Sequence, residues 1–195
     1  MTMPSDHEYG CGDPENDEWF ILSRDLLEGR EDIRRAIEAF EGDPRHPVSA
    51  EGADWLKKAA IYERACITRL LLNGGYLAAF YGLASAEVTI TRPKELERLG
   101  IHGGRRVPAS HMDWVVRSRY FKGIGERVLL HATVVARDVA TAQGNLVLSL
   151  DPYDDGTATM WRGFGFTQSA TEVGEGLRRM YLPLFGYRSL VNGRE

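Results

Sequence analysis

Apolar residues recur at helical spacing in the first part of the 195-residue chain. The pattern predicts helix from Glu18 onwards, because apolar residues take positions on one face of a helix. The clearest of them are Ile33, Ala36, Ile37 and Phe40. Gly42-Asp43-Pro44 ends this segment, and a second helix is predicted from Ser49 to about Arg64. Residues 1–17 contain few apolar residues, so we expect them to be disordered.

Strand-length apolar runs follow these helices. Ile67–Leu72 and Tyr76–Ile90 flank Asn73-Gly74-Gly75, whose residues tolerate the backbone angles of a tight reversal. This arrangement predicts a β-hairpin. Residues 91–107 are basic, rich in glycine and followed by Pro108, and they are predicted to be a long loop.

A strand, a glycine turn and a helix are predicted next. Ala109–Arg117 is the strand, and it leads into Gly123-Ile124-Gly125. The helix shows apolar residues at Val128, Ala132, Val135 and Val139. Gly144 closes this helix, and the remaining predictions are a strand at Leu146–Leu150, a short helix at Asp155–Gly163 and a terminal strand at Leu177–Leu184. Because Pro183 lacks an amide hydrogen, we expect that last strand to lie at a sheet edge.

The net charge of −4 is unevenly distributed along the chain. Residues 1–50 carry 5 Lys and Arg against 13 Asp and Glu, or −8, whereas the other 145 residues carry 19 against 15, or +4. The basic loop is therefore a candidate RNA-facing patch, although such clusters are often merely solvated. Only Cys11 and Cys66 are present, so no disulfide framework and no metal site are predicted. The sequence shows no signal peptide or membrane span, which predicts a cytoplasmic protein.

The glycine turn is the clearest candidate for binding chemistry. Two glycines between a strand and a helix let backbone amides converge at the positive end of the helix dipole, where they can bind phosphate. Arg119 and Lys122 add positive charge. A plain turn is the alternative, because such glycine pairs are common. The P-loop and Rossmann fingerprints are both absent, since no Gly-Lys-Ser/Thr follows and Val128 occupies the third glycine position.

Six ordered motifs give the chain a family resemblance over about residues 54–184. They are Asp54-Trp55-Leu56-Lys57-Lys58-Ala59, Tyr81-Gly82-Leu83-Ala84, Glu97-Arg98-Leu99-Gly100 with Val107-Pro108, Asp113-Trp114-Val115-Val116, Lys122-Gly123-Ile124-Gly125, and Asp154-Asp155 through Phe166. Together they resemble the GNAT N-acetyltransferases, and within these the bacterial toxins that acetylate aminoacyl-tRNA.

This resemblance implies a mixed α/β (α+β) fold with a mostly antiparallel sheet, flanking helices and a strand pair that splays apart. It also implies that acetyl-CoA is the co-substrate. The residues expected to bind it are Trp114, Val115, Val116, Arg119, Lys122, Gly123, Ile124, Gly125, Glu126 and Asp154. Backbone amides near Val115 and Val116 would polarise the thioester, and those of the glycine loop would bind the pyrophosphate.

Three residues are candidates for the acyl-transfer chemistry. In the family, a tyrosine protonates the leaving thiolate. Trp161 occupies that position here, and its indole can donate a hydrogen bond but does not titrate. His111 and Asp113 alternate on the predicted strand, so either is a candidate base for the incoming amine. The alternatives are a structural role for His111 and a packing role for Trp161. A packing or solvated role is also expected for His131.

The resemblance implies an acetyl-CoA-dependent N-acyltransferase acting on a primary amine of a small molecule, peptide, protein or aminoacyl-tRNA. The alternative is a catalytically silent CoA-binding module that acts through a protein or RNA partner. We expect an acidic extension at residues 1–48, partly disordered and then helical, and an acyltransferase domain at residues 49–195. The resemblance further implies a homodimer, and it makes tRNA or an antitoxin-like protein a candidate partner.

Overall fold

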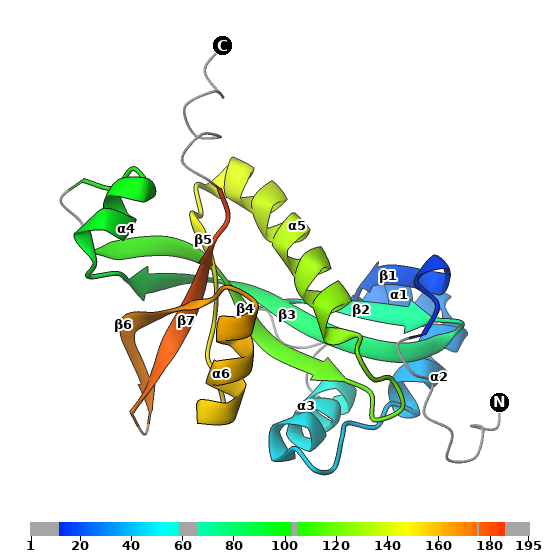
Figure 1. Cartoon of the computed structure of the whole chain (residues 1–195). Helices are drawn as coiled ribbons and strands as arrows, with labels where there is room; N and C mark the ends of the chain where they lie inside the picture. The colour runs from blue at the N-terminus through cyan, green and yellow to red at the C-terminus, as the bar shows by residue number, and fades with distance from the viewer. Residues whose placement is uncertain (1–11, 59–65, 103–104, 175, 186–195) are drawn as a thin grey trace. The chain divides into compact units, whose positions relative to one another are not determined.

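The computed structural model describes residues 12–58, 66–102, 105–174 and 176–185. Its strands form a mixed sheet with the order β1-β2-β3-β4-β5-β7-β6, in which β4 and β5 are parallel (Figure 1). The chain divides into two compact units. Unit 1 comprises Met1–Gly82 and Trp114–His131, and unit 2 comprises Leu83–Asp113 and Ala132–Glu195. Three long elements, namely β3, β4 and α5, contribute residues to both units.

Unit 1 holds the first strands and the first three helices. Its complete elements are β1 (Asp17–Ile21), α1 (Arg24–Gly29), α2 (Glu31–Glu38), α3 (Pro47–Lys58) and β2 (Cys66–Asn73). It also contains a 3-10 turn at Pro14–Asn16, the start of β3 (Tyr76–Thr89), the end of β4 (Arg106–Arg117) and the start of α5 (Gly125–Gln143).

The predicted helix from Glu18 is wrong at its beginning, because Asp17–Ile21 forms strand β1. This strand pairs antiparallel with β2, in a register that places Trp19 opposite Leu71. Trp19-Phe20-Ile21 is a run of aromatic and β-branched residues, which pack well on a sheet. Their pairing partner lies about fifty residues further along the chain. The helical part of the prediction is confirmed at α2, where Ile33 and Ile37 are buried.

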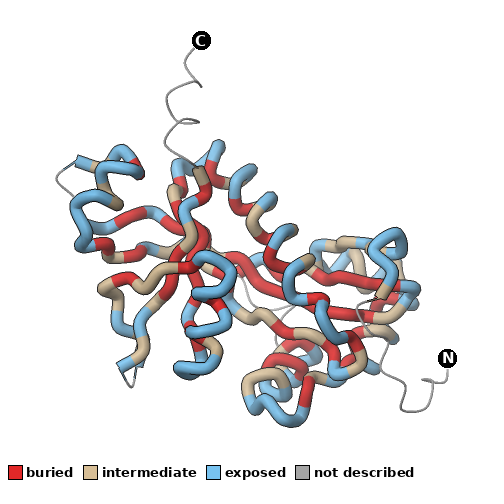
Figure 2. Tube along the Cα trace, in the orientation of Figure 1, coloured by how far each residue is buried: buried red, intermediate tan, exposed pale blue. Residues whose placement is uncertain are grey.

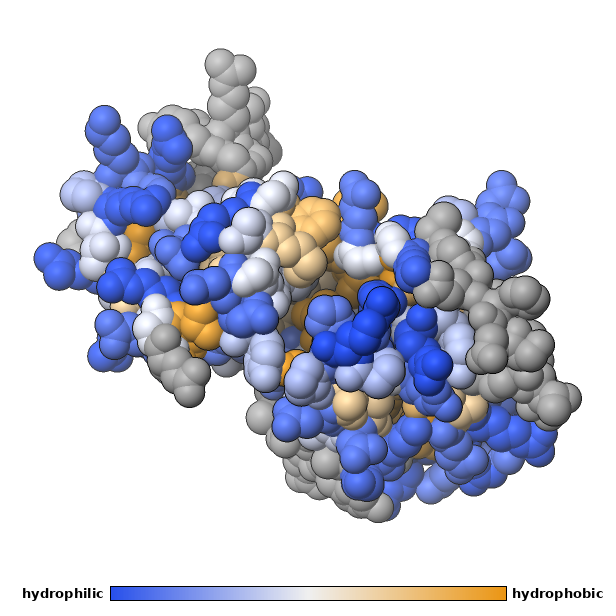
Figure 3. Space-filling view, turned by 60° about the horizontal axis from the view of Figure 1, so that its bottom comes forward, coloured by the Kyte–Doolittle hydropathy of each residue, from blue (hydrophilic) through white to orange (hydrophobic). Residues whose placement is uncertain are grey.

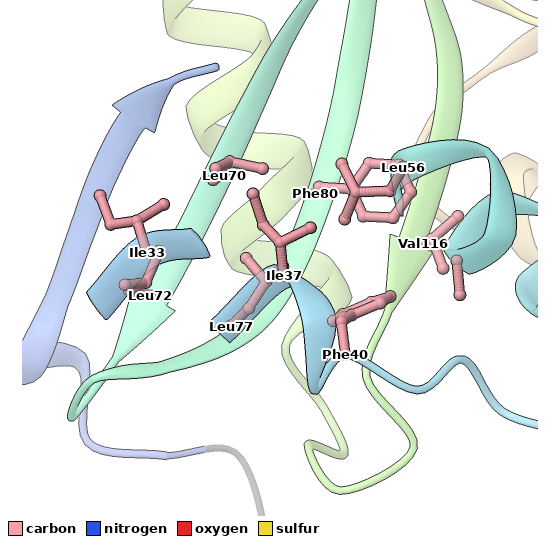
Figure 4. Close-up of a cluster of buried hydrophobic side chains, with 10 residues drawn as sticks. Ile33, Ile37, Phe40, Leu56, Leu70, Leu72, Leu77, Phe80 and Val116 are labelled. Atoms are coloured by element: carbon pink, nitrogen blue, oxygen red, sulfur yellow. The ribbon is translucent and has the colours of Figure 1, made fainter. Parts of the chain in front are cut away.

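The core of unit 1 forms where α2 and α3 cover the sheet (Figure 4). Phe80 on β3 is fully buried and meets Phe40 edge-to-face, with ring centroids 5.5 Å apart. The other buried members are Ile33, Ile37, Ala53, Leu56, Leu70, Leu72, Leu77 and Val116. Residues 17–40 therefore contribute a strand and two helices to the sheet and core of this unit.

The predicted hairpin is confirmed by β2 and β3. Gly74 and Gly75 connect the strands with φ angles of 59° and 83°, in the left-handed region that favours glycine. The predicted second helix is confirmed as α3, which begins at Pro47. Its expected end at Arg64 lies outside the described residues.

Unit 2 holds the remainder of β3, β4 and α5 together with the later elements. These are α4 (Pro93–Arg98), β5 (Val147–Leu150), α6 (Asp155–Gly163), β6 (Thr167–Gly174) and β7 (Leu177–Pro183). The structure confirms the strand, glycine turn and helix that end in α5, and α6 has the predicted bounds. Gly144 has the expected left-handed conformation, with a φ of 76°.

Two predictions for unit 2 are wrong. The basic segment after residue 91 contains the helix α4, in which Pro93 occupies the first turn and loses no intrahelical hydrogen bond. The terminal strand β7 is not an edge strand, because it lies between β5 and β6. Pro183 is tolerated there at the last position of the strand. Strand β6 is a polar segment with no apolar alternation, and the sequence pattern did not reveal it.

Buried residues follow the strands, and exposed residues dominate the helices (Figure 2). On the face shown in Figure 3, most of the described surface is hydrophilic, and hydrophobic residues appear in separate patches. None of the described helices has the length and apolar character needed to cross a membrane.

The fold predicts a clear contrast between two identical substitutions. Leu70→Ala removes a fully buried side chain from the core of unit 1, and it should lower the free energy of unfolding by about 2–5 kcal/mol. Leu130→Ala acts on a side chain that is 66% exposed, and it should change that free energy by less than about 0.5 kcal/mol. Urea denaturation measures both values. Equal effects of the two variants would contradict the assignment of the core.

Candidate functional site

The glycine loop of unit 1 connects β4 to α5. Phe121 and Ile124 anchor it, with exposed fractions of 2% and 0%, whereas Gly123 and Gly125 are exposed. Gly123 has a φ of 74°, which a residue with a side chain rarely adopts. The loop is therefore held by its apolar side chains and presents backbone at its surface.

Helix α5 starts with open space around its first residue. A Cβ added at Gly125 would meet no atom within 4 Å. The amide of Val128 donates to the Ile124 carbonyl, so the amides of Gly125 and Glu126 precede the first intrahelical bond. Such amides at the N-terminus of a 19-residue helix can bind an anion, as the sequence analysis expected of this turn.

Arg117 secures the loop from the end of β4. One terminal nitrogen of its guanidinium donates to the carbonyls of Ser118 and Phe121, at 3.3 and 3.2 Å. The other donates to the Asp43 carboxylate at 3.0 Å. Asp43 is 2% exposed and also accepts two bonds from the Arg45 guanidinium, at 3.0 and 2.8 Å. These bonds from Arg45, opposed only in part by burial, hold the pKa of Asp43 well below its usual range.

Residues 41–43, which we call the strap, run beside the glycine loop. Gly42 forms an antiparallel bridge with Ser118, and the Arg119 amide donates to the Glu41 carbonyl at 2.9 Å. The Glu41 carboxylate accepts from Arg119 and from the Tyr120 hydroxyl, at 3.1 and 3.3 Å. A Cβ at Gly42 would lie 2.1 Å from the Ser49 carbonyl oxygen, so only glycine fits there.

The strap changes the interpretation of Arg119. From the sequence, Arg119 is predicted to add positive charge for phosphate binding. In the structure its guanidinium forms an ion pair with Glu41 and lies 5.2 Å from the ring centre of Tyr120. Lys122 is exposed on the loop beside the glycines. Backbone amides and Lys122 therefore offer the more direct contacts for an anion at this loop.

The end of β4 holds the residues predicted to lie beside the thioester. Trp114 stacks on Trp55 of α3, with ring centroids 5.7 Å apart, and Val116 is buried. Helix α3 approaches this strand closely, since a Cβ at Gly52 would lie 2.5 Å from a Val116 methyl. Val115 is half-buried. These contacts fix the position of the strand end in unit 1.

In unit 2, the parallel pairing of β4 with β5 runs only from Ala109↔Val147 to Met112↔Leu150, where β5 ends. The resemblance implied a strand pair that splays beyond this point. The short register agrees with that implication, because Asp113 already lies past the last pair.

His111 is part of a polar cluster in unit 2. Its Nδ1 lies 3.1 Å from the hydroxyl of the fully buried Ser149, and its Nε2 lies 3.7 Å from the Asp151 carboxylate. Arg179 donates two bonds to Asp151, at 2.7 and 2.8 Å. The imidazole is thus oriented by a hydroxyl on one side and faces a fixed carboxylate on the other.

Burial lowers the pKa of His111 below its ordinary value of 6.5, and the nearby charge of Arg179 lowers it further. The carboxylates of Asp151 and Asp113 act in the opposite direction but do not reverse the shift. The imidazole is consequently neutral at pH 7, which is the form that can accept a proton.

Trp161 and Asp154 have structural contacts in unit 2. Trp161 is 8% exposed and packs against Phe164 and Phe166, with ring centroids 5.9 and 5.4 Å away. Asp154 caps α6 by accepting a bond from the Thr157 amide at 2.6 Å. Packing therefore accounts for Trp161, and helix capping accounts for Asp154. A role of Trp161 in catalysis and a role of Asp154 in cofactor binding stay predictions.

His131 has the packing role that was expected. Its ring stacks on Trp19, with centroids 3.6 Å apart and an interplanar angle of 5°, and its Nδ1 lies 2.7 Å from the Tyr81 hydroxyl. Burial and the charge of Arg69 lower the pKa of His131 to about 4. It therefore stays neutral in the core of unit 1.

Sequence reasoning missed the residues that position the candidate groups. Gly42-Asp43 was interpreted only as a helix terminator, and Asp151 and Arg179 were not singled out. Their partners are far away in sequence, and no local pattern identifies them. Among the described residues, no group of His, Cys, Asp and Glu side chains could hold a metal ion.

Neither protein-family models nor curated protein sequences match this chain. Solved structures do. A tyrosine-to-phenylalanine mutant of KacT is similar over 90% of this chain and 99% of its own, with 14% identity and a TM-score of 0.68. AtaT complexed with acetyl-methionyl-tRNAfMet is similar over 90% and 97%, with 14% identity and a TM-score of 0.67.

A third structure is a mutant of the toxin AtaT bound to acetyl-CoA and the C-terminus of the antitoxin AtaR. It is similar over 89% of this chain and 97% of its own, with 14% identity and a TM-score of 0.61. The chain has the GNAT fold. The predicted fold class is thereby confirmed. At this level of identity the comparison establishes the architecture, and the chemistry must be argued from the residues themselves.

The Asp43–Arg117 pair predicts a pH-dependent loss of stability. Asp43→Asn should lower the free energy of unfolding at pH 7 by about 1–3 kcal/mol, because charged hydrogen bonds to a buried group are lost. The pKa of Asp43 is depressed in the folded state, so its contribution is present above the ordinary carboxyl pKa and is lost as the pH falls towards the depressed value.

Urea denaturation of Asp43→Asn and the wild type should therefore give curves that converge as the pH is lowered. Asp54→Asn is the matched control, because the Asp54–Lys58 pair is exposed at both ends and contributes little. A constant gap between Asp43→Asn and the wild type at all pH values would contradict the assignment.

Proposed function

We propose that this protein is an acetyl-CoA-dependent N-acyltransferase that acts on a primary amine. The observation that carries the proposal is the glycine loop of unit 1, which is secured by Arg117 and the strap and has no atom within 4 Å of the place where a Cβ of Gly125 would stand. A rigid row of amides at a helix N-terminus suits the pyrophosphate of coenzyme A.

The residues of unit 1 fit this cofactor. Gly123, Ile124, Gly125 and Glu126 would bind the pyrophosphate by their amides, with Lys122 beside them. The Glu126 side chain adds negative charge at the same helix end, so this residue would contribute through its backbone only. The backbone near Val115 and Val116 would polarise the thioester carbonyl. A structure of AtaT with the same fold contains acetyl-CoA, which supports this assignment.

Acetyl-CoA would supply an acetyl group activated as a thioester. On this proposal, His111 accepts the proton that the amine loses as its nitrogen bonds to the carbonyl carbon and the carbon–sulfur bond breaks. Asp151 and Arg179 are positioning residues for His111, and Asp113 adds a second carboxylate close to it.

The sulfur can leave without help from Trp161. A thiol has an ordinary pKa of about 8.5, so the thiolate is a tolerable leaving group near neutral pH and can take its proton from water. We therefore propose that Trp161 shapes the site by packing and that the chain is slower than an enzyme with a titrating acid in its place.

The similar structures suggest candidates for the acceptor amine and for a partner protein. AtaT with the same fold has been solved with acetyl-methionyl-tRNAfMet, which makes aminoacyl-tRNA a candidate acceptor here, and the AtaR complex makes an antitoxin-like protein a candidate partner. The prediction of a homodimer stands on the family resemblance alone.

A second candidate function is a silent CoA-binding module. The packing of Trp161 against Phe164 and Phe166 favours it, because a buried indole provides no titrating acid. The two functions share the cofactor site and differ in turnover. Binding of acetyl-CoA with no acetylation of pooled amines or charged tRNA would select the silent module.

Cofactor binding is tested by placing a side chain in the open space at Gly125. The Cβ of Gly125→Ala would meet no protein atom within 4 Å but should obstruct the amides, and this variant should weaken acetyl-CoA binding at least about tenfold in calorimetric titration. Gly29→Ala is the matched control, since a Cβ there also meets no atom within 4 Å and Gly29 lies at the end of α1. Absence of binding to the wild type at millimolar acetyl-CoA would refute the proposed function.

The role of His111 is tested by the pH dependence of thiol release. Because the pKa of His111 is lowered, the rate should stay constant as the pH falls through 6.5 and should decline only below that value. His111→Gln should reduce kcat by about 10² to 10⁴. Asp151→Asn removes a carboxylate that raises the pKa of His111, so it should move the decline to still lower pH. A profile that is identical in all three proteins would exclude His111 as the base.

A further inference from the structure

A polar cavity of about 110 Å³ lies in unit 2, lined by the segment between β3 and α4, by α4, and by β6 and β7. It is separate from the glycine loop and from His111. Its volume corresponds to roughly four water molecules of the liquid, which is enough for a small anionic group. The residues that define its chemistry are Arg92, Glu95, Gln168, Ser169, Arg178 and Tyr181.

The lining residues of the cavity include two arginines and one carboxylate. The Glu95 carboxylate accepts from the Tyr181 hydroxyl and from Arg92, the latter at 3.1 Å, so it already pairs with one of these arginines. Within the described part of the chain, the side chains of Arg178 and Gln168 form no hydrogen bond or ion pair, although Glu172, outside the lining, is the antiparallel partner of Arg178 on β6. The lining therefore carries more positive than negative charge and has unused donors, which is the chemistry that binds an oxyanion.

The wall formed by β6 is irregular where it borders the cavity. Its register with β7 shifts between Gln168 and Glu172, as it does at a β-bulge. Thr171 accepts a bond from the Thr89 amide at 2.9 Å, and the Thr171 amide donates to the Ser169 hydroxyl oxygen at 3.0 Å. The Ser169 hydroxyl hydrogen stays available as a donor. These bonds hold the bulge in place and leave the Ser169 hydroxyl as a donor at the cavity.

The cavity is connected to His111 through the sheet. His111 pairs with Ser149 across β4 and β5, and Ser149 pairs with Tyr181 across β5 and β7. Two strand spacings separate the His111 and Tyr181 backbones, or about 10 Å. One acceptor molecule of moderate length could thus place its amine at His111 and another of its groups in the cavity.

We propose that this cavity binds a phosphate group carried by the amine acceptor. The inference rests on the proposed function and specifies its substrate class. Donors from several elements surround the cavity, so they can reach the oxygens of a tetrahedral anion on different sides, which a planar carboxylate does not offer. The phosphate belongs either to a small aminoalkyl phosphate or to the backbone of an RNA that carries the amine.

Direct binding is measured with inorganic phosphate at constant ionic strength, by calorimetry and by amide chemical shifts of the full chain. Phosphate should bind in the millimolar range and shift the amides of β6 and β7. Arg178→Gln should weaken it at least about tenfold, and Gln168→Leu should also weaken it without a charge change. Arg24→Gln is the control, because this exposed arginine on α1 does not line the cavity. No binding, or equal loss in Arg178→Gln and Arg24→Gln, would overturn the inference.

Kinetics then identify the source of the phosphate. Two acceptors are compared, an aminoalkyl phosphate that spans about 10 Å and a short aminoacylated RNA. The true class is the one whose KM rises in Arg178→Gln, with little change in kcat, and stays constant in Arg24→Gln. If neither KM depends on Arg178 while the protein acetylates both, this inference fails and the proposed function stands. If acetyl-CoA does not bind while phosphate does, the proposed function fails and the cavity is still a phosphate site.

Discussion

The ion pair between the buried Asp43 carboxylate and the half-buried Arg117 is the constraint on which the candidate cofactor site depends. Arg117 can hold the Ser118 and Phe121 carbonyls only if its guanidinium is itself fixed, and Asp43 fixes it at 3.0 Å. A carboxylate that is 2% exposed must be compensated, and Arg45 supplies the remaining bonds. The same pair therefore satisfies a buried charge and sets the path of the chain into α5.

Both units use an aspartate–arginine pair to position their candidate groups. In unit 1 the pair is Asp43 with Arg117, and in unit 2 it is Asp151 with Arg179, whose two bonds are 2.7 and 2.8 Å long. Arginine suits this task because its planar guanidinium carries several donors. Arg179 binds its carboxylate at two points, whereas Arg117 joins one carboxylate to two backbone carbonyls. These arginines consequently act as supports for the backbone of the glycine loop in unit 1 and for the His111 imidazole in unit 2.

The elements with strong local signals were predicted correctly. The Gly74-Gly75 turn needs left-handed backbone angles that glycine adopts at little cost, so the hairpin could be recognised from its residues alone. The same holds for Gly123 in the loop and Gly144 after α5. Helix α6 has an aspartate cap, which marks its start. The glycine loop of the candidate site was thus predictable, because its chemistry depends on backbone conformation and on neighbouring residues.

The sequence by itself determined these turns, the apolar faces of α2 and α5, and the absence of dinucleotide and P-loop fingerprints. Only the tertiary structure decided that Asp17–Ile21 is a strand, that β7 lies inside the sheet, and that Arg119 pairs with Glu41. The reason is sequence separation. Asp43 and Arg117 are 74 residues apart, and Asp151 and Arg179 are 28 apart. No local pattern encodes such a pair, because its energy exists only once the folded backbone has brought both charges together.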